Sequence, residues 1–115
     1  ASPPAAVEKD RQRFSHAPLV LAVIARLTPG HKVPECEQLL SGGAVCFALL
    51  QGAQALGFGA QWLTGWAAYD PVVLARLGVG PDEAVLGFIH IGTASAPAPG
   101  RQRPDARELL SDWTP

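Results

Sequence analysis

Apolar runs alternate with short polar or glycine-rich segments along most of the chain. Residues 19–25 form a short apolar run rich in β-branched side chains, which predicts a strand buried on both faces. Residues 84–92 form a second strongly apolar run and predict another strand. A shorter strand is expected over residues 59–63, ending at Thr64 and Gly65. The pattern therefore predicts three strands.

A long helix is expected between the strand at residues 19–25 and the strand at residues 59–63. Pro34 suits the first turn of a helix, and the acidic side chains of Glu35 and Glu37 favour its positive end. The apolar pattern continues to about Leu56, and Gly57 suits the left-handed position that follows a helix. We therefore predict one helix over this whole segment.

Shorter helices are expected before and after this core. Residues 5–13 are polar and have the character of the end of a helix. Asp70 and Pro71 can cap and start a helix over residues 72–77, which Gly78 would close. Strands and helices that follow one another in this order are typical of an α+β or α/β fold.

The long helix carries an unusual number of small residues. Gly42 and Gly43 each cost roughly 1 kcal/mol of helix propensity. Ala44, Ala48 and Gly52 are four residues apart, so one face of the helix is nearly bare backbone. Such a stripe allows close packing of another helix, and it also allows contact with a flat ligand.

The chain after Thr93 changes character. Residues 94–104 are an extended segment of proline, alanine and arginine without core-forming side chains. The following tail is short and amphipathic, with Leu109, Leu110 and Trp113 able to dock. This pattern indicates an extension that packs on something else, such as another subunit.

Composition narrows the class of protein. A chain of 115 residues with 48% apolar and 17% charged residues is one globular domain at most, and a net charge of −1 argues against nucleic-acid binding. Residues 38–69 are free of charge, but their glutamines and glycines favour a helix buried in protein over a membrane span. Cys36 and Cys46 are interpreted as buried thiols of a reducing compartment, here the cytoplasm. The absence of methionine indicates a processed chain or a piece of a longer one.

No self-contained catalytic or metal site is visible in the sequence. His31, Glu35 and Cys36 do not have zinc-ligand spacing, and the sequence predicts no metal. His90 lies inside an apolar strand and is interpreted as a core histidine with satisfied hydrogen bonds. Burial should make the thiol of Cys46 inert. No serine has the context of a nucleophile elbow, and no standard phosphate loop is present.

What remains is a set of flat rings and a set of cations. Trp62 and Trp66 lie among glycines without nearby charge, and Arg101 and Arg103 lie on the extended arm. A flat apolar pocket together with arginines favours an aromatic cofactor with a phosphate group, and FMN is the natural candidate.

The order of several motifs resembles the C-terminal portion of the FMN-dependent nitroreductase family, most closely its compact bacterial branch. The resemblance covers nearly everything from residue 14 onward. Its motifs are APLV at 17–20, HKVPECEQ at 31–38, SGGAV at 41–45, GAQALGFGAQWLTG at 52–65, DP at 70–71 and VLGFIHIGT at 85–93.

The resemblance implies an α+β fold in which helices flank a mixed sheet and a long central helix lies at the interface of a homodimer, with FMN bound between the subunits. It implies hydride transfer from NADH or NADPH through FMN to nitroaromatic or other small-molecule acceptors. Trp62, Leu63, Thr64 and Gly65 would border the isoalloxazine ring. The segment from Gly52 to Gly57 would receive the nicotinamide cofactor.

The roles of the two arm arginines follow from the same resemblance. Arg101 and Arg103 are candidates for the FMN phosphate, and the competing interpretation is that they are solvated charges of a linker. Relatives commonly carry arginine where this chain has Leu63, so one polar contact to the flavin is expected to be absent.

The family begins with a helix whose Arg-Arg-Ser-type motif grips the FMN phosphate. The segment from Arg11 to Ser15 is superficially similar, but it immediately precedes the first strand. We therefore expect residues 1–115 to be a single domain, the C-terminal part of a nitroreductase-like domain without the N-terminal part that binds the phosphate. A non-catalytic dimerising fragment that does not bind flavin by itself, and a flavin-binding protein without turnover, are the alternatives.

Overall fold

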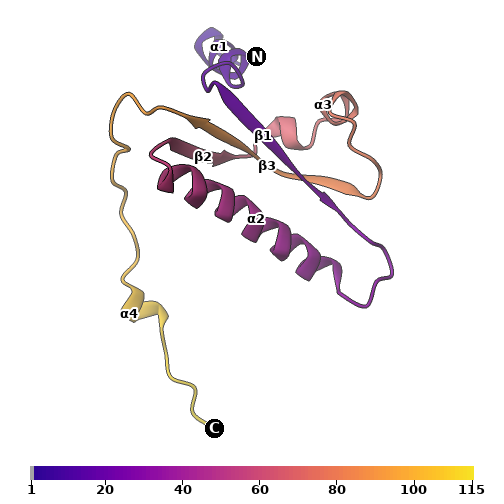
Figure 1. The fold of residues 1–115 in the computed structure, drawn as a ribbon, viewed down its shortest axis with the longest axis vertical. Helices are drawn as coiled ribbons and strands as arrows, with labels where there is room; N and C mark the ends of the chain where they lie inside the picture. Colours follow the sequence, from indigo (N-terminus) through magenta and orange to yellow (C-terminus); the bar gives the residue numbers. More distant parts are fainter. Residues whose placement is uncertain (1) are drawn as a thin grey trace.

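The computed structural model describes residues 2–115 as a three-stranded sheet with helices on both faces (Figure 1). In chain order the elements are α1 (Pro4–Gln12), β1 (Leu19–Arg26), α2 (Glu35–Ala55), β2 (Gly59–Leu63), the 3-10 helix η1 (Trp66–Ala68), α3 (Pro71–Arg76), β3 (Glu83–Gly92) and α4 (Ala106–Leu109). The predicted α+β class is confirmed, and all three predicted strands are present.

The strand order is β1-β3-β2, and β3 is antiparallel to both neighbours. The resemblance implied a mixed sheet, and the three strands of the described residues form an antiparallel part of such a sheet. Because β3 is central, it holds the buried side chains Val85, Phe88 and Ile89. The prediction that residues 19–25 are buried on both faces is wrong, because β1 is an edge strand and Leu19 remains 47% exposed.

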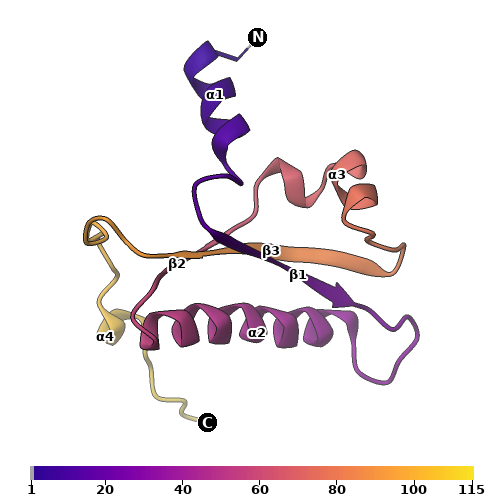
Figure 2. The same ribbon diagram turned by 45° about the horizontal axis from the view of Figure 1, so that its top comes forward.

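Helix α2 covers one face of the sheet (Figure 2). Its inward side carries the buried Cys46 and Ala53, and Gly42 approaches β3 so closely that a Cβ there would overlap Leu86 Cδ1. This close approach offsets the helix propensity that glycine loses. Ala44 and Ala48 lie on the exposed side of the helix.

The other face of the sheet carries the hydrophobic core. Ala67 and Ala68 of η1 pack with Val85 and Phe88 of β3, and residues of β1 and α3 surround them. The side chain of Asp70 accepts hydrogen bonds from the backbone of the first turn of α3 at 2.9 and 3.1 Å, so the predicted cap is confirmed. The sequence pattern did not predict η1.

Both ends of the chain project from this core. Helix α1 stands away from the sheet, and the arm after β3 runs past the end of α2 (Figures 1 and 2). The radius of gyration is 17.6 Å, compared with about 13 Å for a compact domain of this size. Leu109, Leu110 and Trp113 are 72–84% exposed within the described residues, and the packing of this tail on another subunit remains a prediction.

Among the described helices, none combines the length and the hydropathy that crossing a bilayer requires. The charge-free segment 38–69 is divided among α2, β2 and η1, and α2 packs against β2.

Candidate functional site

An open groove of about 1540 Å³ lies between the end of α1, the outer edge of the sheet and the C-terminal arm. Its walls therefore come from segments that are far apart in the sequence. The lining residues include Lys9, Asp10, Arg13, His16, Leu50, Gln61, Trp62, Leu63, His90, Arg101 and Arg103. The groove is large enough to receive a small organic molecule.

Strand β2 positions Trp62 and Leu63 on opposite faces of the sheet. The indole Nε1 of Trp62 donates a hydrogen bond of 3.1 Å to the carbonyl oxygen of Leu86. Leu86 lies where the pairing of β1 with β3 shifts register between Val23 and Ile24, so β3 carries one extra residue there. A bulge leaves backbone groups outside the regular ladder, and the indole hydrogen-bonds to one of them.

Gly87 makes room for this arrangement. A Cβ at this position would overlap Trp62 Nε1 and lie 3.2 Å from the carbonyl oxygen of Leu63. The far edge of the indole reaches α2, where a Cβ on Gly43 would lie 3.9 Å from Trp62 Cη2. Trp62 is therefore anchored on the helix side of the sheet, and its 38% exposed surface contributes to the groove.

The charged side chains of the groove are mostly cations. Arg101 and Arg103 come from the arm, whereas Lys9 and Arg13 come from α1, and Asp10 is the one acidic residue of the lining. Within residues 2–115, none of the four cations has a carboxylate within ion-pair distance. Cations without counterions that converge on a groove favour binding of an anion.

Of the eight residues predicted to bind FMN or the nicotinamide cofactor, the structure brings four together: Trp62, Leu63, Arg101 and Arg103 all line the groove. The remaining four do not line it. Thr64 and Gly65 directly follow β2, Gly52 is exposed on α2, and Gly57 ends that helix with a φ of 89°. Their roles in cofactor binding remain predictions.

Arg13 is a groove residue that the sequence reasoning did not assign. Its guanidinium lies on Gly65, where a Cβ would overlap Nη1 and stand 3.0 Å from Cζ. The next residue, Phe14, fixes this end of α1 on the sheet, because its ring lies 5.0 Å from that of Phe88 in an edge-to-face contact. The sequence does contain a signal for this contact. Phe14 is an aromatic residue directly after a polar helix, which indicates that this end of the helix packs on the rest of the protein.

His90 is buried, but it is not the satisfied core histidine predicted from the sequence. Its imidazole stacks on Phe14 with ring centroids 5.9 Å apart, and Nε2 has no hydrogen-bond partner among the described residues. Phe14, which follows α1, covers the imidazole with an aromatic ring that offers no hydrogen-bond acceptor in its plane. Burial, and secondly the positive charge of Arg13, lower the pKa of His90 below 6.5.

This lowered pKa predicts that the protein becomes less stable under mildly acidic conditions. The unfolded chain binds a proton on His90 at pH values near 6.5, whereas the folded chain resists protonation. The contribution of His90 is therefore fully present above pH 6.5 and is lost as the pH falls toward the lower folded-state pKa. Urea unfolding between pH 7.5 and 5 checks this. His90→Phe should flatten the pH dependence, and an unchanged slope in that variant would contradict the assignment to His90.

The two thiols differ in environment. Cys46 is fully buried under the sheet, and burial raises the pKa of its thiol, as expected for an inert cysteine. Cys36 is exposed, so the prediction of a buried thiol is wrong there, because it lies in the first turn of α2 at the end of the helix. Residues 2–115 contain no group of three or more potential metal-ligating side chains.

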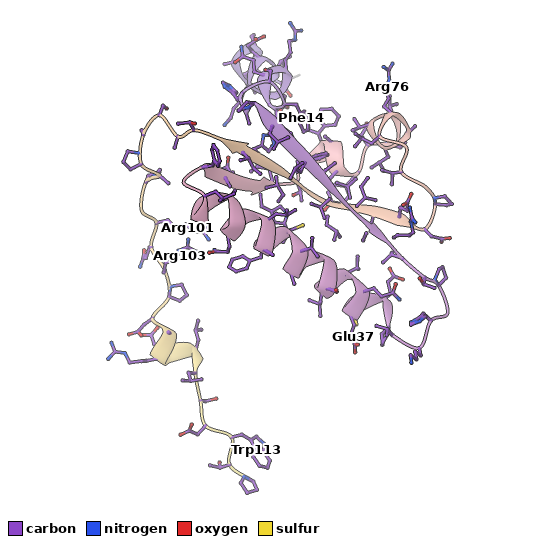
Figure 3. All side chains as sticks on the ribbon, viewed as in Figure 1. Phe14, Glu37, Arg76, Arg101, Arg103 and Trp113 are labelled. Atoms are coloured by element: carbon purple, nitrogen blue, oxygen red, sulfur yellow. The ribbon has the colours of Figure 1, made fainter. Side chains whose placement is uncertain are left out.

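The side chains that line the groove are of the types that could bind a flavin. An apolar and aromatic edge is formed by Trp62 and Leu63, and guanidinium groups without counterions stand on the arm. Figure 3 shows Arg101 and Arg103 on the arm, well separated from Phe14 at the end of α1. A molecule with a flat ring and a phosphate group could contact both regions.

Comparison with known proteins gives a consistent result. A family model described as the nitroreductase family matches residues 3–93. The chain is 36% identical over 88 residues to the Escherichia coli (strain K12) protein named "Putative NAD(P)H nitroreductase YdjA", covering 76% of this chain and 48% of that protein. It is 35% identical over 78 residues to the "Putative NAD(P)H nitroreductase" of Haemophilus influenzae, covering 67% of this chain and 42% of that protein. The chain therefore spans about half the length of the curated relatives it matches.

Two solved structures share the fold. The nitroreductase-like family protein from Bacillus cereus has a TM-score of 0.77 at 21% identity, covering 91% of this chain and 59% of that one. The "putative nitroreductase in complex with FMN" from Desulfovibrio desulfuricans has a TM-score of 0.70 at 24% identity, covering 99% of this chain and 68% of that one. With the family match extending over most of the sequence and the same fold in both structures, the chain belongs to the nitroreductase family.

Proposed function

We propose that this chain is part of an FMN-dependent oxidoreductase that transfers hydride from NADH or NADPH to nitroaromatic or other small-molecule acceptors. The observation that carries the proposal is the groove, which joins the Trp62–Leu63 edge of the sheet to Arg101 and Arg103. Membership of the nitroreductase family and the FMN bound in the Desulfovibrio desulfuricans protein support the choice of cofactor.

The flavin, when bound, supplies the hydride chemistry, so no side chain of this protein is required as a general acid or base. Trp62 and Leu63 would provide an apolar wall against the ring and limit access of water to it. Arg101 and Arg103 would bind the phosphate with charge-assisted hydrogen bonds. The groove is open to solvent, which leaves space for the nicotinamide cofactor and the acceptor to reach the ring.

We also propose that the chain forms a homodimer through the exposed side of α2. Leu40, Val45 and Phe47 are 50–72% exposed there, next to the small side chains of Ala44 and Ala48. An apolar helix face of this kind is stabilised when a second helix covers it. Sedimentation equilibrium at micromolar concentration should give twice the chain mass, and Phe47→Glu should shift it toward the monomer. A wild-type monomer would contradict the proposal.

Cytoplasmic localisation is part of the same proposal. Its support is that both cysteines are free thiols, since proteins of reducing compartments rarely form disulfides.

The function is tested by adding FMN to the purified chain, removing the excess and recording the visible absorption spectrum. A retained flavin band, followed by oxidation of NADH or NADPH with a nitroaromatic acceptor, is the expected result. A retained band without turnover would indicate a flavin-binding protein, which contradicts the enzymatic part. A colourless protein would favour the non-catalytic dimerising fragment and would overturn the proposal for the chain by itself.

A further inference from the structure

We propose that the α1 end of the groove is a second anion subsite, which takes the 2′-phosphate of NADPH and couples its binding to protonation of His90. The subsite is formed by Lys9, Arg13 and His16, and the buried His90 lies at the same end. This inference rests on the proposed function and deepens it by naming the preferred reductant.

The cations of the groove come from two separate segments. Lys9 lies on α1 and Arg13 follows the last residue of that helix, whereas Arg101 and Arg103 lie on the arm. Figure 3 shows both arm arginines well separated from Phe14, which directly follows Arg13. Interactions between exposed charges are largely screened beyond about 8 Å at physiological salt. An FMN phosphate bound by the arm would therefore leave the cations at the α1 end without an anion.

The groove has room for a second ligand beside a flavin. Its volume is about 1540 Å³, whereas a pocket for one small molecule has about 300–1,000 Å³. Asp10 is the one carboxylate of the lining, and neither Lys9 nor Arg13 has a carboxylate within ion-pair distance among residues 2–115. This excess of positive charge favours an anionic group at the α1 end.

His90 is the buried polar group of this subsite. Its side chain is 9% exposed, it lines the groove, and Nε2 has no hydrogen-bond partner within the described part of the chain. Buried polar atoms in folded proteins almost always have a partner. An orphaned nitrogen in the wall of a cationic groove therefore indicates a group that responds to a ligand.

Charged groups reach His90 from one side only. In the sheet, the uncharged residues Val20 of β1 and Gln61 of β2 lie directly opposite it, and η1 contains no charged residue. The titratable groups at this end of the groove all come from α1 and the segment after it: Lys9, Asp10, Arg13 and His16. Burial, and secondly the charge of Arg13, lower the pKa of His90.

An anion bound beside these cations would change that balance. A phosphate monoester carries about −1.5 to −2 charges at pH 7, so it would offset the field of Arg13 and favour the charged imidazole. Because coupling is reciprocal, a proton on His90 would strengthen phosphate binding by the same factor. NADPH has a 2′-phosphate and NADH has none, so the subsite predicts a preference for NADPH.

The test measures dissociation constants of NADP⁺ and NAD⁺ by isothermal titration calorimetry with the purified chain at pH 7. The wild type should bind NADP⁺ about tenfold or more tightly than NAD⁺, and the difference should shrink as salt rises. Lys9→Gln should remove most of the difference by weakening NADP⁺ binding, whereas Lys9→Arg should retain it. Lys32→Gln is the matched control, because Lys32 is also exposed and lies outside the groove.

Proton uptake is the second measurement. Titrations with NADP⁺ in two buffers of different ionisation enthalpy give the number of protons taken up with the ligand. His90→Gln should lower this number, whereas His31→Gln, at an exposed histidine outside the groove, should leave it unchanged. The 2′-phosphate itself titrates near pH 6, so wild type and variants are compared with the same ligand.

Equal affinities of the wild type for NADP⁺ and NAD⁺, with FMN still bound by the chain, would overturn the inference and leave the proposed function intact. The same conclusion would follow if Lys9→Gln weakened binding of FMN, because the α1 end would then hold the flavin phosphate. Proton uptake that is lost in His16→Gln and kept in His90→Gln would overturn the coupling to His90. A wild-type chain that binds neither FMN nor either dinucleotide would overturn both the inference and the proposed function.

Discussion

Replacing both Arg101 and Arg103 with glutamine is expected to weaken FMN binding by about a hundredfold or more. Hydrogen bonds to charged groups contribute about 1.5–3 kcal/mol each, and about 1.4 kcal/mol corresponds to a tenfold change in affinity. Both side chains line the groove without carboxylate partners among residues 2–115. The variant loses the charges but keeps side chains of similar length.

The measurement is a fluorescence titration with FMN and riboflavin at two salt concentrations. Riboflavin binding should be unchanged, and the FMN advantage of the wild type should shrink as salt rises. Arg107→Gln is the matched control, since Arg107 lies on the same arm, is paired with Asp105 at 3.1 Å and does not line the groove. An equal loss for both flavins, or no loss for either, would show that the arm does not bind the phosphate.

Gly87→Ala is expected to lower the free energy of unfolding by about 3 kcal/mol. Overpacking a filled site costs about 1–3 kcal/mol, and loss of a hydrogen bond costs about 0.5–1.5 kcal/mol more. The added methyl group would overlap Trp62 Nε1, and the carbonyl oxygen of Leu63 at 3.2 Å limits any shift of the strand. The indole must therefore move and give up its hydrogen bond to Leu86.

Urea unfolding followed by far-ultraviolet circular dichroism measures this loss, and tryptophan fluorescence reports the displaced indole. Gly100→Ala is the matched control, because a Cβ there would meet nothing within 4 Å. Gly87→Ala should also weaken flavin binding, since Trp62 forms part of the groove wall. If Gly87→Ala unfolded at the same urea concentration as Gly100→Ala, β3 or Trp62 would have shifted without loss of stability, which would contradict this prediction.

Local signals were sufficient to predict most of the elements. Pro34 and Gly57 bound the long helix, and the structure places it at Glu35–Ala55 with Leu56 as its cap. Asp70 predicted the start of α3 because its carboxylate binds the free backbone N–H groups of the first turn. Such signals act within a few residues, so they can be read from a single sequence.

Other features depend on which segments become neighbours. The edge position of β1 follows from the strand order, which an apolar run does not encode. The bulge at Leu86 exists only relative to the register of β1 against β3. The short helix η1 has no periodic pattern of its own, and its alanines are buried because β3 and α3 cover them.

The candidate site divides in the same way. The sequence by itself determined that aromatic rings and arginines are present in motifs resembling those of a flavin-binding family, and it identified Trp62, Leu63, Arg101 and Arg103. Only the tertiary structure decided that these four residues share one groove and that Arg13 joins them. The physical reason is that local conformation depends on residues close in sequence, whereas a binding site depends on the packing of segments that are distant in sequence.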